Sequence, residues 1–350
     1  FIEMTPPSGD LKYLAGVGRA IYDGMAQADT NAVWLLQGWT FMNQAHFWKQ
    51  DRIKAFLDAV PNEHMLVLDL YCEKSPVWNH TEGFHGKPWV WSWVYNFGNR
   101  VQFPSASLAT FNTLDAARRH PLGNNLRGVG MLMEGYGHDP MVFDLMYELP
   151  WRDGKVDIAG WMKDYVRFRY GKENADAGRA WTRLLAGPYA RTAGGYAAIC
   201  SVEAPADANP HRACPEAAPA WGDLLKAASD LGRTETYRHD LVFIARQALN
   251  DRAHALHGRV MAAYGAKDAP AHEKAVAEFM AVLSDLDELL GADPGFLLGS
   301  WLEDAKRWGN TDAERAKLEW NARRILTHWG TGTALRDYSR REWSGMISSF

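Results

Sequence analysis

The first 150 residues alternate short apolar runs with amphipathic segments, and this rhythm constrains the fold more than any other feature. Apolar runs predict strands at Ala32–Leu36, Met65–Leu70, Trp89–Tyr95 and Val129–Met133. Apolar residues at three- and four-residue steps predict helices at Tyr13–Met25, Gln50–Val60, Leu108–Arg119 and Pro140–Glu148. Such alternation favours parallel strands joined by helical crossovers. The continuous run at Ala32–Leu36 is typical of a strand buried on both faces.

Four predicted strands are too few to close a barrel, which needs about eight. Either the sheet is open, or the chain begins halfway round a barrel. The chain begins at Phe1 without a methionine, inside a motif that already reads as ordered, so we favour the second half of a TIM-like (β/α)8 barrel. Alone, a half-barrel with two unpaired edges is expected to be poorly stable and inactive.

From about Val156 the composition changes and strand runs vanish. We therefore expect residues 1–155 to form the C-terminal part of a barrel and residues 156–350 to form an α-helical bundle domain. The predicted helices are Ile158–Tyr170, Ala175–Leu185, Ala220–Leu231, Tyr237–Tyr264, His272–Leu290, Pro294–Trp308, Asp312–Trp329 and Leu335–Phe350. A long Pro/Gly/Ala-rich loop, Gly187–Pro219, separates them, and loops of this length are usually either disordered or functional.

Composition and motifs exclude several classes of function. Of 350 residues 23% are charged and the formal net charge is -4, which predicts neither nucleic-acid nor membrane binding. The sequence has no Walker motif, no Gly-x-Ser-x-Gly elbow and no His-Glu-x-x-His motif. His254 and His257 lie three positions apart without a carboxylate pattern, so we expect no metal and no cofactor. Cys72, Cys200 and Cys214 predict buried thiols, with a Cys200–Cys214 disulfide as the alternative.

The chain contains 16 tryptophans, whose flat faces can stack on sugar rings or fill a core. Three at helical spacing are expected in the core: Trp161, Trp181 and Trp320. Five near predicted strand ends and loops are better candidates for a ligand cleft: Trp39, Trp78, Trp89, Trp91 and Trp93.

Two carboxylates lie at the C-terminal ends of predicted strands, which is where a barrel has its active site. Glu134 follows the run Val129–Met133 and precedes a glycine-rich turn, and Glu3 precedes two prolines that lead away from a strand end. Taken alone, a strand-end glutamate more often caps a helix or pairs with an arginine. Two such carboxyls in one cleft could divide the roles of acid and nucleophile or base in glycosidic cleavage. Asp69, inside a predicted strand, is a third carboxylate for which we expect a structural hydrogen bond.

Ordered motifs in both halves carry a resemblance to a known family. They are Glu3-Met4-Thr5-Pro6-Pro7, Ala32-Val33-Trp34-Leu35-Leu36-Gln37-Gly38-Trp39, Leu66-Val67-Leu68-Asp69-Leu70, Tyr95-Asn96-Phe97-Gly98, Gly128-Val129-Gly130 through Glu134-Gly135, Glu148-Leu149-Pro150-Trp151-Arg152, Phe296-Leu297-Leu298-Gly299-Ser300-Trp301-Leu302-Glu303 and His328-Trp329-Gly330. The chain resembles the C-terminal half or more of the α-N-acetylglucosaminidases, glycoside hydrolase family 89.

The resemblance implies a catalytic barrel followed by an all-helical domain, and an exo-acting hydrolase whose partner is a glycan with terminal α-linked N-acetylglucosamine. It implies Glu134 as nucleophile, Glu3 as general acid/base, Trp39 as an aromatic wall of the sugar subsite and Asn96 as a cleft residue. The family's animal members are lysosomal, whereas the Ala/Arg/Asp-rich helices here suggest a bacterial protein that is periplasmic or secreted. A homo-oligomer is a further partner that the sequence leaves open.

One departure keeps alternatives open. The family pattern has Asn immediately before the acid/base, and this chain has Ile2. A retaining glycosidase for another α-linked sugar therefore remains an alternative, as does a non-catalytic carbohydrate-binding protein on the same fold. The expected mechanism is double displacement, because the acetamido group of an α-N-acetylglucosaminide lies on the same face as the leaving group and cannot attack from behind. The protein must then supply the nucleophile.

Overall fold

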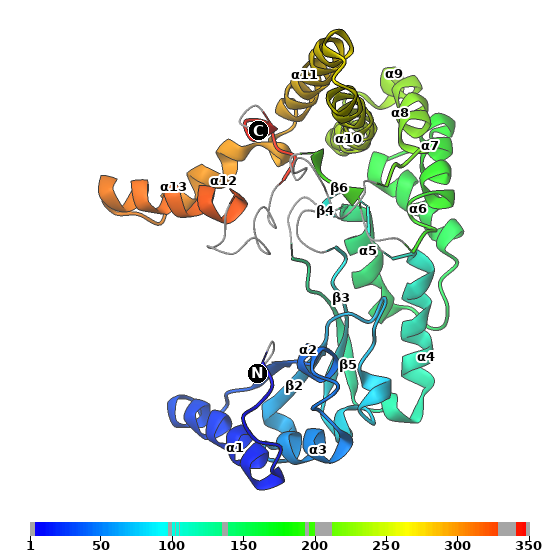
Figure 1. The fold of residues 1–350 in the computed structure, drawn as a ribbon. Helices are drawn as coiled ribbons and strands as arrows, with labels where there is room; N and C mark the ends of the chain where they lie inside the picture. The colour runs from blue at the N-terminus through cyan, green and yellow to red at the C-terminus, as the bar shows by residue number, and fades with distance from the viewer. Residues whose placement is uncertain are drawn as a thin grey trace. The chain divides into compact units, whose positions relative to one another are not determined.

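The computed structural model describes residues 4–96, 100–101, 103–104, 106–134, 139–192, 196–199, 212–327 and 341–347. The chain divides into two compact units (Figure 1). Unit 1 consists of Phe1–Tyr95, Leu108–Met133 and Pro140–Val156, and unit 2 consists of Asn96–Ser107, Glu134–Asp139 and Asp157–Phe350.

Unit 1 is built on a parallel sheet, as the alternation of strands and helices predicts. Within the described residues its strands are β1 (Trp34–Gln37), β2 (Met65–Asp69), β3 (Trp89–Trp93) and β5 (Leu126–Met131), in that spatial order. The helices of this unit are α1 (Leu11–Ala28), α2 (Trp39–Asn43), α3 (Gln50–Asp58), α4 (Thr113–Arg119) and α5 (Pro140–Glu148). Short 3-10 turns lie at η1 (Asn62–His64), η2 (Trp78–His80), η3 (Phe84–Gly86), η4 (Leu108–Asn112), η5 (Pro121–Gly123) and η6 (Leu149–Trp151).

The tryptophans of β3 lie in the centre of the unit 1 core. Trp89, Trp91 and Trp93 are at most 1% exposed, and alternate strand residues point to one face of a sheet. The Trp93 ring stacks on Phe111 with 4.0 Å between centroids, and Trp89 stacks on Trp78 at 5.6 Å. The expectation that these three strand residues line a ligand cleft is therefore wrong, because their rings are already covered by other aromatic side chains.

Strand β1 differs from its prediction. Leu35 is 59% exposed and Gln37 is exposed, whereas Trp34 and Leu36 are half-buried. Among the described strands β1 pairs only with β2. The prediction was a strand buried on both faces, and within the described residues one face of β1 is covered.

Unit 2 is helical, as predicted. Its described helices are α6 (Ile158–Tyr170), α7 (Ala175–Ala186), α8 (Ala217–Lys226), α9 (Ala228–Leu231), α10 (Glu235–Ala266), α11 (Ala269–Gly291), α12 (Leu298–Lys306) and α13 (Asp312–Thr327), with a 3-10 turn η8 (Pro294–Phe296). Two short strands, β4 (Arg100–Val101) and β6 (Tyr196–Ala197), pair antiparallel. β6 lies within the predicted long loop.

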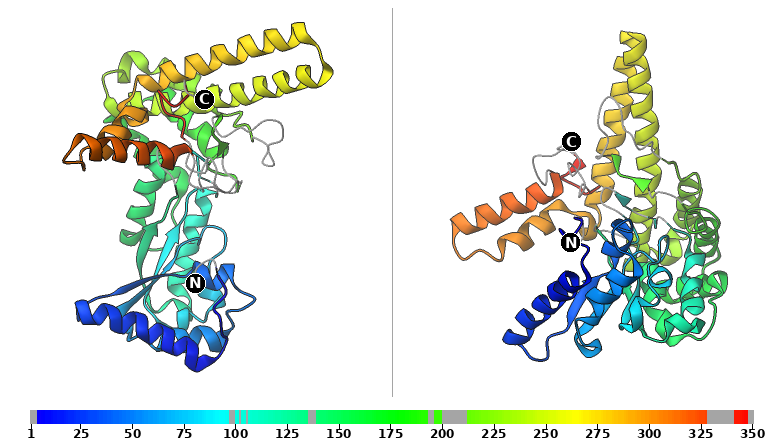
Figure 2. Two further views of the ribbon diagram at one scale, coloured as in Figure 1. Left: turned by 60° about the vertical axis from the view of Figure 1, so that its left-hand side comes forward. Right: turned by 60° about the horizontal axis from the view of Figure 1, so that its bottom comes forward.

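Local chemistry determines where the unit 2 helices begin and end. The Asp157 side chain accepts a hydrogen bond from Ala159 N at the start of α6, and Gly171, at φ 75°, ends it. α10 and α11 run side by side as a long hairpin (Figure 2). The turn between them uses Lys267 at φ 55° and the Asp268 carboxylate, which accepts a hydrogen bond from Ala271 N.

Two predictions in the C-terminal third are wrong. The predicted helix Leu335–Phe350 is described only over residues 341–347, and over these residues it is not α-helical. Ser344 instead forms an isolated parallel bridge with Leu297. Trp320, expected in the core, is 56% exposed and lies under the Arg324 guanidinium. Trp161 and Trp181 are buried as predicted.

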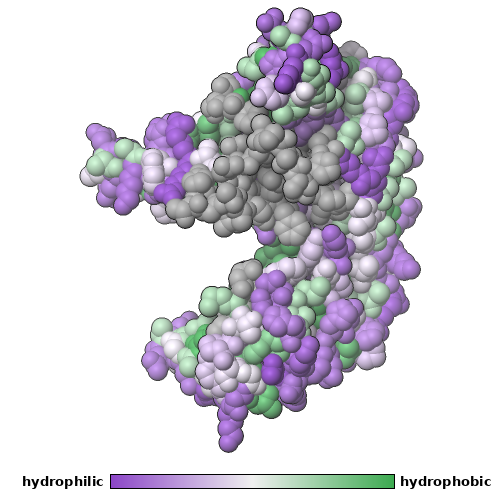
Figure 3. Space-filling model, in the orientation of Figure 1, coloured by the Kyte–Doolittle hydropathy of each residue, from purple (hydrophilic) through white to green (hydrophobic). Residues whose placement is uncertain are grey.

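The visible surface is mainly hydrophilic, and hydrophobic residues are scattered over it (Figure 3). None of the described helices is long and apolar enough to cross a membrane.

Candidate functional site

The carboxyl ends of parallel strands lie at one edge of a sheet, and ligands of α/β sheets bind outside this edge. In unit 1, Trp39 follows β1, Asp69 ends β2 and Glu73 follows it, and Tyr95 follows β3. These residues form the candidate site of unit 1.

Asp69 anchors the loop that follows β2. It is fully buried, and its Oδ2 accepts hydrogen bonds from Val77 N at 2.9 Å and Trp78 N at 2.8 Å. Burial raises the pKa of Asp69 to about 6, although these two backbone bonds oppose the rise. The expected structural hydrogen bond of Asp69 is confirmed.

Glu73 lies in the loop that Asp69 anchors and reaches the end of the next strand. The side chain is 5% exposed, and its Oε1 accepts hydrogen bonds from Val94 N at 2.9 Å and Tyr95 N at 3.0 Å. Its Oε2 is buried without a hydrogen-bond partner among the described residues. Burial raises the pKa of Glu73 to about 8, and the charge of Asp69 adds to the rise.

Trp39 is the first residue of α2 and is half-buried. Its ring meets Tyr71 edge to face, with 5.9 Å between centroids and 69° between planes. Tyr71 belongs to the same loop as Glu73. This loop therefore packs against Trp39, the residue expected to form an aromatic wall of the sugar subsite.

Asn96 belongs to unit 2 and is fully buried. Its Nδ2 donates a hydrogen bond of 2.6 Å to Phe103 O, while its Oδ1 has no partner among the described residues. Phe103 packs edge to face on Tyr189 and on Phe243. Asn96 is thus tied to the aromatic core of unit 2.

Glu134 lies three residues beyond β5 and also belongs to unit 2. Its side chain is exposed, and its backbone oxygen accepts a 3.5 Å hydrogen bond from the Nη2 atom of the buried Arg341. Asp139, the last residue of the same segment, is 1% exposed and accepts a hydrogen bond from the Tyr189 hydroxyl. The two ends of this segment are therefore held by residues of unit 2.

The predicted site residues are distributed over both units. Trp39 belongs to unit 1, and Asn96 and Glu134 belong to unit 2. Glu3 lies outside the described residues.

Sequence reasoning missed three buried polar residues: Glu73, Arg341 and Glu342. Glu342 is fully buried, its Oε1 accepts a 2.8 Å hydrogen bond from Ile199 N, and burial raises its pKa to about 7 against the opposing charge of Arg246. The position of Glu73, four residues after a strand-end aspartate, was a usable signal. Arg341 and Glu342 fell in a segment predicted to be a helix, which concealed them.

The described residues hold no group of three or more His, Cys, Asp or Glu side chains that could bind a metal ion. Cys214 is a free, buried thiol, and Cys200 lies outside the described residues.

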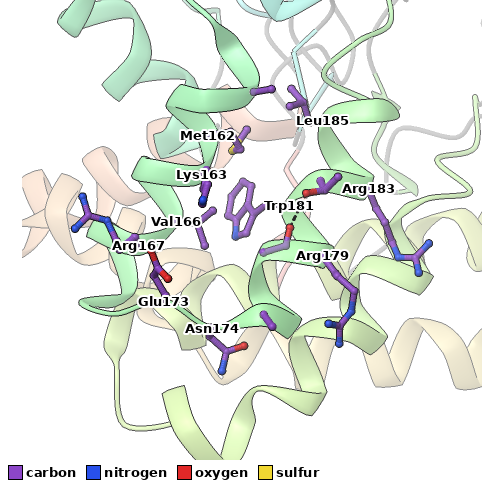
Figure 4. Close-up of a pocket in the computed structure, with 14 residues that line it drawn as sticks. Met162, Lys163, Val166, Arg167, Glu173, Asn174, Arg179, Trp181, Arg183 and Leu185 are labelled. Carbon is purple, nitrogen blue, oxygen red and sulfur yellow. Dashed lines mark hydrogen bonds between the residues drawn. The ribbon is translucent and has the colours of Figure 1, made fainter.

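A groove of about 750 Å³ lies between α6 and α7 (Figure 4). Three of its basic side chains are already ion-paired: Arg167 with Asp164, Arg179 with Asp176 and Arg183 with Asp223. Trp181 at its centre is 1% exposed, and its Nε1 donates to the Tyr170 hydroxyl. We therefore assign the groove no ligand.

A parallel sheet with carboxylates at its strand ends, followed by a mainly helical unit, defines an α/β domain followed by a helical domain. Two family models match in the same order. The alpha-N-acetylglucosaminidase (NAGLU) tim-barrel domain matches residues 1–153, and the NAGLU C-terminal domain matches residues 161–350. The chain belongs to the alpha-N-acetylglucosaminidase family.

Individual relatives agree with this membership. Human alpha-N-acetylglucosaminidase is 36% identical over 370 aligned positions, which cover 100% of this chain and 48% of the human protein. The chain thus spans about half the length of this relative.

Solved structures show the same fold. A family 89 glycoside hydrolase from Clostridium perfringens in complex with 2-acetamido-1,2-dideoxynojirmycin superposes with a TM-score of 0.84 at 24% identity, over 96% of this chain and 39% of that one. A Clostridium perfringens variant with two glutamates replaced by glutamine, in complex with its substrate GlcNAc-alpha-1,4-galactose, gives a TM-score of 0.83 at 23% identity, with the same coverage. The predicted barrel-type and helical architecture is confirmed.

Proposed function

We propose that the protein is an exo-acting glycoside hydrolase that removes terminal α-linked N-acetylglucosamine from glycans by double displacement. The observation that carries the proposal is the 36% identity to human alpha-N-acetylglucosaminidase along the whole chain. The Clostridium perfringens complex with GlcNAc-alpha-1,4-galactose names a substrate with the same terminal sugar.

Glu134 is the proposed nucleophile and Glu3 the proposed general acid/base. The motifs around both residues resemble those of the family, and the exposed side chain of Glu134 is compatible with attack on a bound sugar. In the first step Glu3 protonates the departing oxygen while Glu134 forms a bond to the anomeric carbon. In the second step Glu3 deprotonates water, which displaces Glu134 and restores the original configuration. This route calls for carboxyl groups about 5–5.5 Å apart.

Trp39 and Asn96 are the proposed substrate-binding residues. The half-buried indole of Trp39 offers an aromatic face for an apolar sugar face. Asn96 is the proposed polar contact because it lies in the family motif that follows β3. Its Nδ2 is held by Phe103 O, which fixes the orientation of the amide.

Residues 1–155 are the proposed contribution to the catalytic barrel, and residues 156–350 the proposed helical domain. The proposed location is the periplasm or the exterior for a bacterial source and the lysosome for an animal source.

The test is a panel of nitrophenyl glycosides on the full-length protein, comparing the α-linked N-acetylglucosaminide with the α-glucoside and the α-N-acetylgalactosaminide. The proposal expects turnover of the first with the highest kcat/KM. Preference for another α-linked sugar would favour the alternative that Ile2 suggests, since this residue replaces the Asn of the family pattern. Sugar binding without hydrolysis, unchanged in Glu134→Gln, would favour a non-catalytic carbohydrate-binding protein.

A further inference from the structure

The loop between β2 and η2 follows the carboxyl end of β2 and contacts the carboxyl end of the neighbouring strand β3. Asp69 holds the far end of this loop through Val77 N and Trp78 N. Within the loop, Cys72 N donates a 2.9 Å hydrogen bond to Ser92 O on β3. The loop is therefore fixed to both β2 and β3 before Glu73 makes its own contacts.

Glu73 bonds to a strained stretch of backbone. Its Oε1 accepts from Val94 N and Tyr95 N, immediately after β3. Tyr95 has φ 71°, in the left-handed region that non-glycine residues rarely adopt. Such a conformation persists only where the surroundings hold it in place. The Tyr95 side chain is fully buried, and the centroid of its ring lies 6.0 Å from that of the Phe143 ring on α5.

We infer that Glu73 is a positioning residue for the glycosidase reaction: it holds the left-handed turn at Tyr95 and so sets the direction in which Asn96 leaves the strand. The inference rests on the proposed function, because Asn96 is a proposed substrate contact. Two acceptor bonds from one carboxyl oxygen fix the Trp93–Val94 and Val94–Tyr95 peptide planes. The left-handed torsion of Tyr95 starts from the second of these planes and directs the following peptide, which leads to Asn96.

The protonation state of Glu73 determines which substitution preserves its hydrogen bonds and which removes them. Burial raises its pKa to about 8, so the side chain is mostly a neutral acid at pH 7. Glutamine has the same shape, keeps a carbonyl oxygen that can accept both amide bonds, and is also neutral. Alanine removes the acceptor, and aspartate is one methylene too short to reach both amides.

Hydrogen–deuterium exchange of the full-length protein tests the contact without reference to activity. The amides of Val94 and Tyr95 are expected to exchange at least about tenfold faster in Glu73→Ala than in the wild type, and at near wild-type rates in Glu73→Gln. Asp223→Ala is the matched control, because Asp223 is 4% exposed and lies in unit 2. If Glu73→Ala does not fold, Glu73→Asp takes its place. Unchanged exchange in the folded variant, or equal acceleration in Glu73→Gln, overturns the inference.

Kinetics test whether the contact acts through Asn96. Glu73→Ala is expected to lower kcat/KM about 10- to 100-fold by misplacing a substrate contact, and Glu73→Gln to stay within about threefold of the wild type. The double variant Glu73→Ala/Asn96→Ala is expected to lose no more kcat/KM than the more damaged of the two single variants. Losses that multiply would show a merely structural role and overturn the inference. Absence of glycosidase activity in the wild type would defeat the proposed function and, with it, the role of Glu73 in the reaction, while the exchange data would still decide the backbone contact.

Discussion

Gly130 of β5 pairs in register with Ser92 of β3, and a Cβ atom at Gly130 would lie 2.9 Å from the Ser92 Oγ. Real Cβ atoms essentially never approach a heavy atom so closely. Gly128, two positions earlier on the same strand, has open space around the corresponding point. Among the described residues, packing between strands therefore requires glycine at position 130 but not at position 128.

Gly130→Ala is expected to lower the free energy of unfolding by about 1–3 kcal/mol, because buried Ser92 must move or the strands must separate. Gly128→Ala, the matched control, is expected to be neutral or slightly stabilising, since alanine restricts the unfolded chain. Urea denaturation of the full-length protein measures both. Ser92→Gly in the Gly130→Ala background is expected to restore stability, and equal losses for the two alanine variants would contradict this packing account.

A second prediction concerns the pH dependence of stability. The pKa of Glu73 rises from 4.5 to about 8 on folding because of burial, and the facing charge of Asp69 adds to it. The folded state therefore binds this proton more tightly, so the stabilisation is complete below pH 4.5 and is lost as the pH rises through 8. The slope from one such group is at most about 1.4 kcal/mol per pH unit.

Glu73→Gln is expected to flatten this decline, as followed by chemical denaturation between pH 5 and 8. Glu342→Gln is the control, because burial raises the pKa of Glu342 only to about 7. Comparison of the two glutamine variants therefore separates the contributions of the two glutamates to the decline. If the free energy of unfolding changes with pH in the same way in the wild type and in Glu73→Gln, the decline is not due to the Glu73 carboxyl.

A third prediction separates an aromatic subsite wall from an exposed tryptophan of the same unit. Trp39→Ala is expected to raise KM about tenfold by removing a stacking surface, and Trp39→Phe to raise it less. Trp151→Ala is the control, since Trp151 is 86% exposed and is expected to leave KM unchanged. Thermal melting must show that Trp39→Ala remains folded, because its ring also contacts Tyr71. Equal KM values for the two alanine variants would remove Trp39 from the subsite.

Much of the fold could be predicted because its signals are local. The helices Pro140–Glu148 and Ile158–Tyr170 have the predicted bounds. The second begins at a capping aspartate and ends at a glycine with positive φ, and both signals depend only on neighbouring residues. The parallel sheet followed from the alternation of strand and helix, which is also readable along the chain.

The errors arose where partners distant in the sequence decide the outcome. The bridge of Ser344 to Leu297 replaces a predicted helix, and no local pattern reveals a partner so far away. Trp93 was expected to line a cleft, but it stacks on Phe111, a residue on the following 3-10 turn. Asp69 was correctly expected to bond structurally, whereas Glu73 was missed because its role depends on the fold of the next strand end.

The last prediction concerns the proposed nucleophile. Glu134→Ala is expected to lower kcat by about 10³-fold or more, because the covalent step loses its attacking group. Azide is small enough to occupy the space of the removed carboxylate and attack the anomeric carbon from the same face. Partial rescue by azide is therefore expected to yield a glycosyl azide with inverted configuration, which nuclear magnetic resonance can identify. Glu173→Ala, an exposed glutamate of unit 2, is expected to keep full activity without azide. A rescued product of retained configuration, or undiminished turnover in Glu134→Ala, would exclude Glu134 as the nucleophile, since only an attacking group that azide replaces directly gives a single inversion.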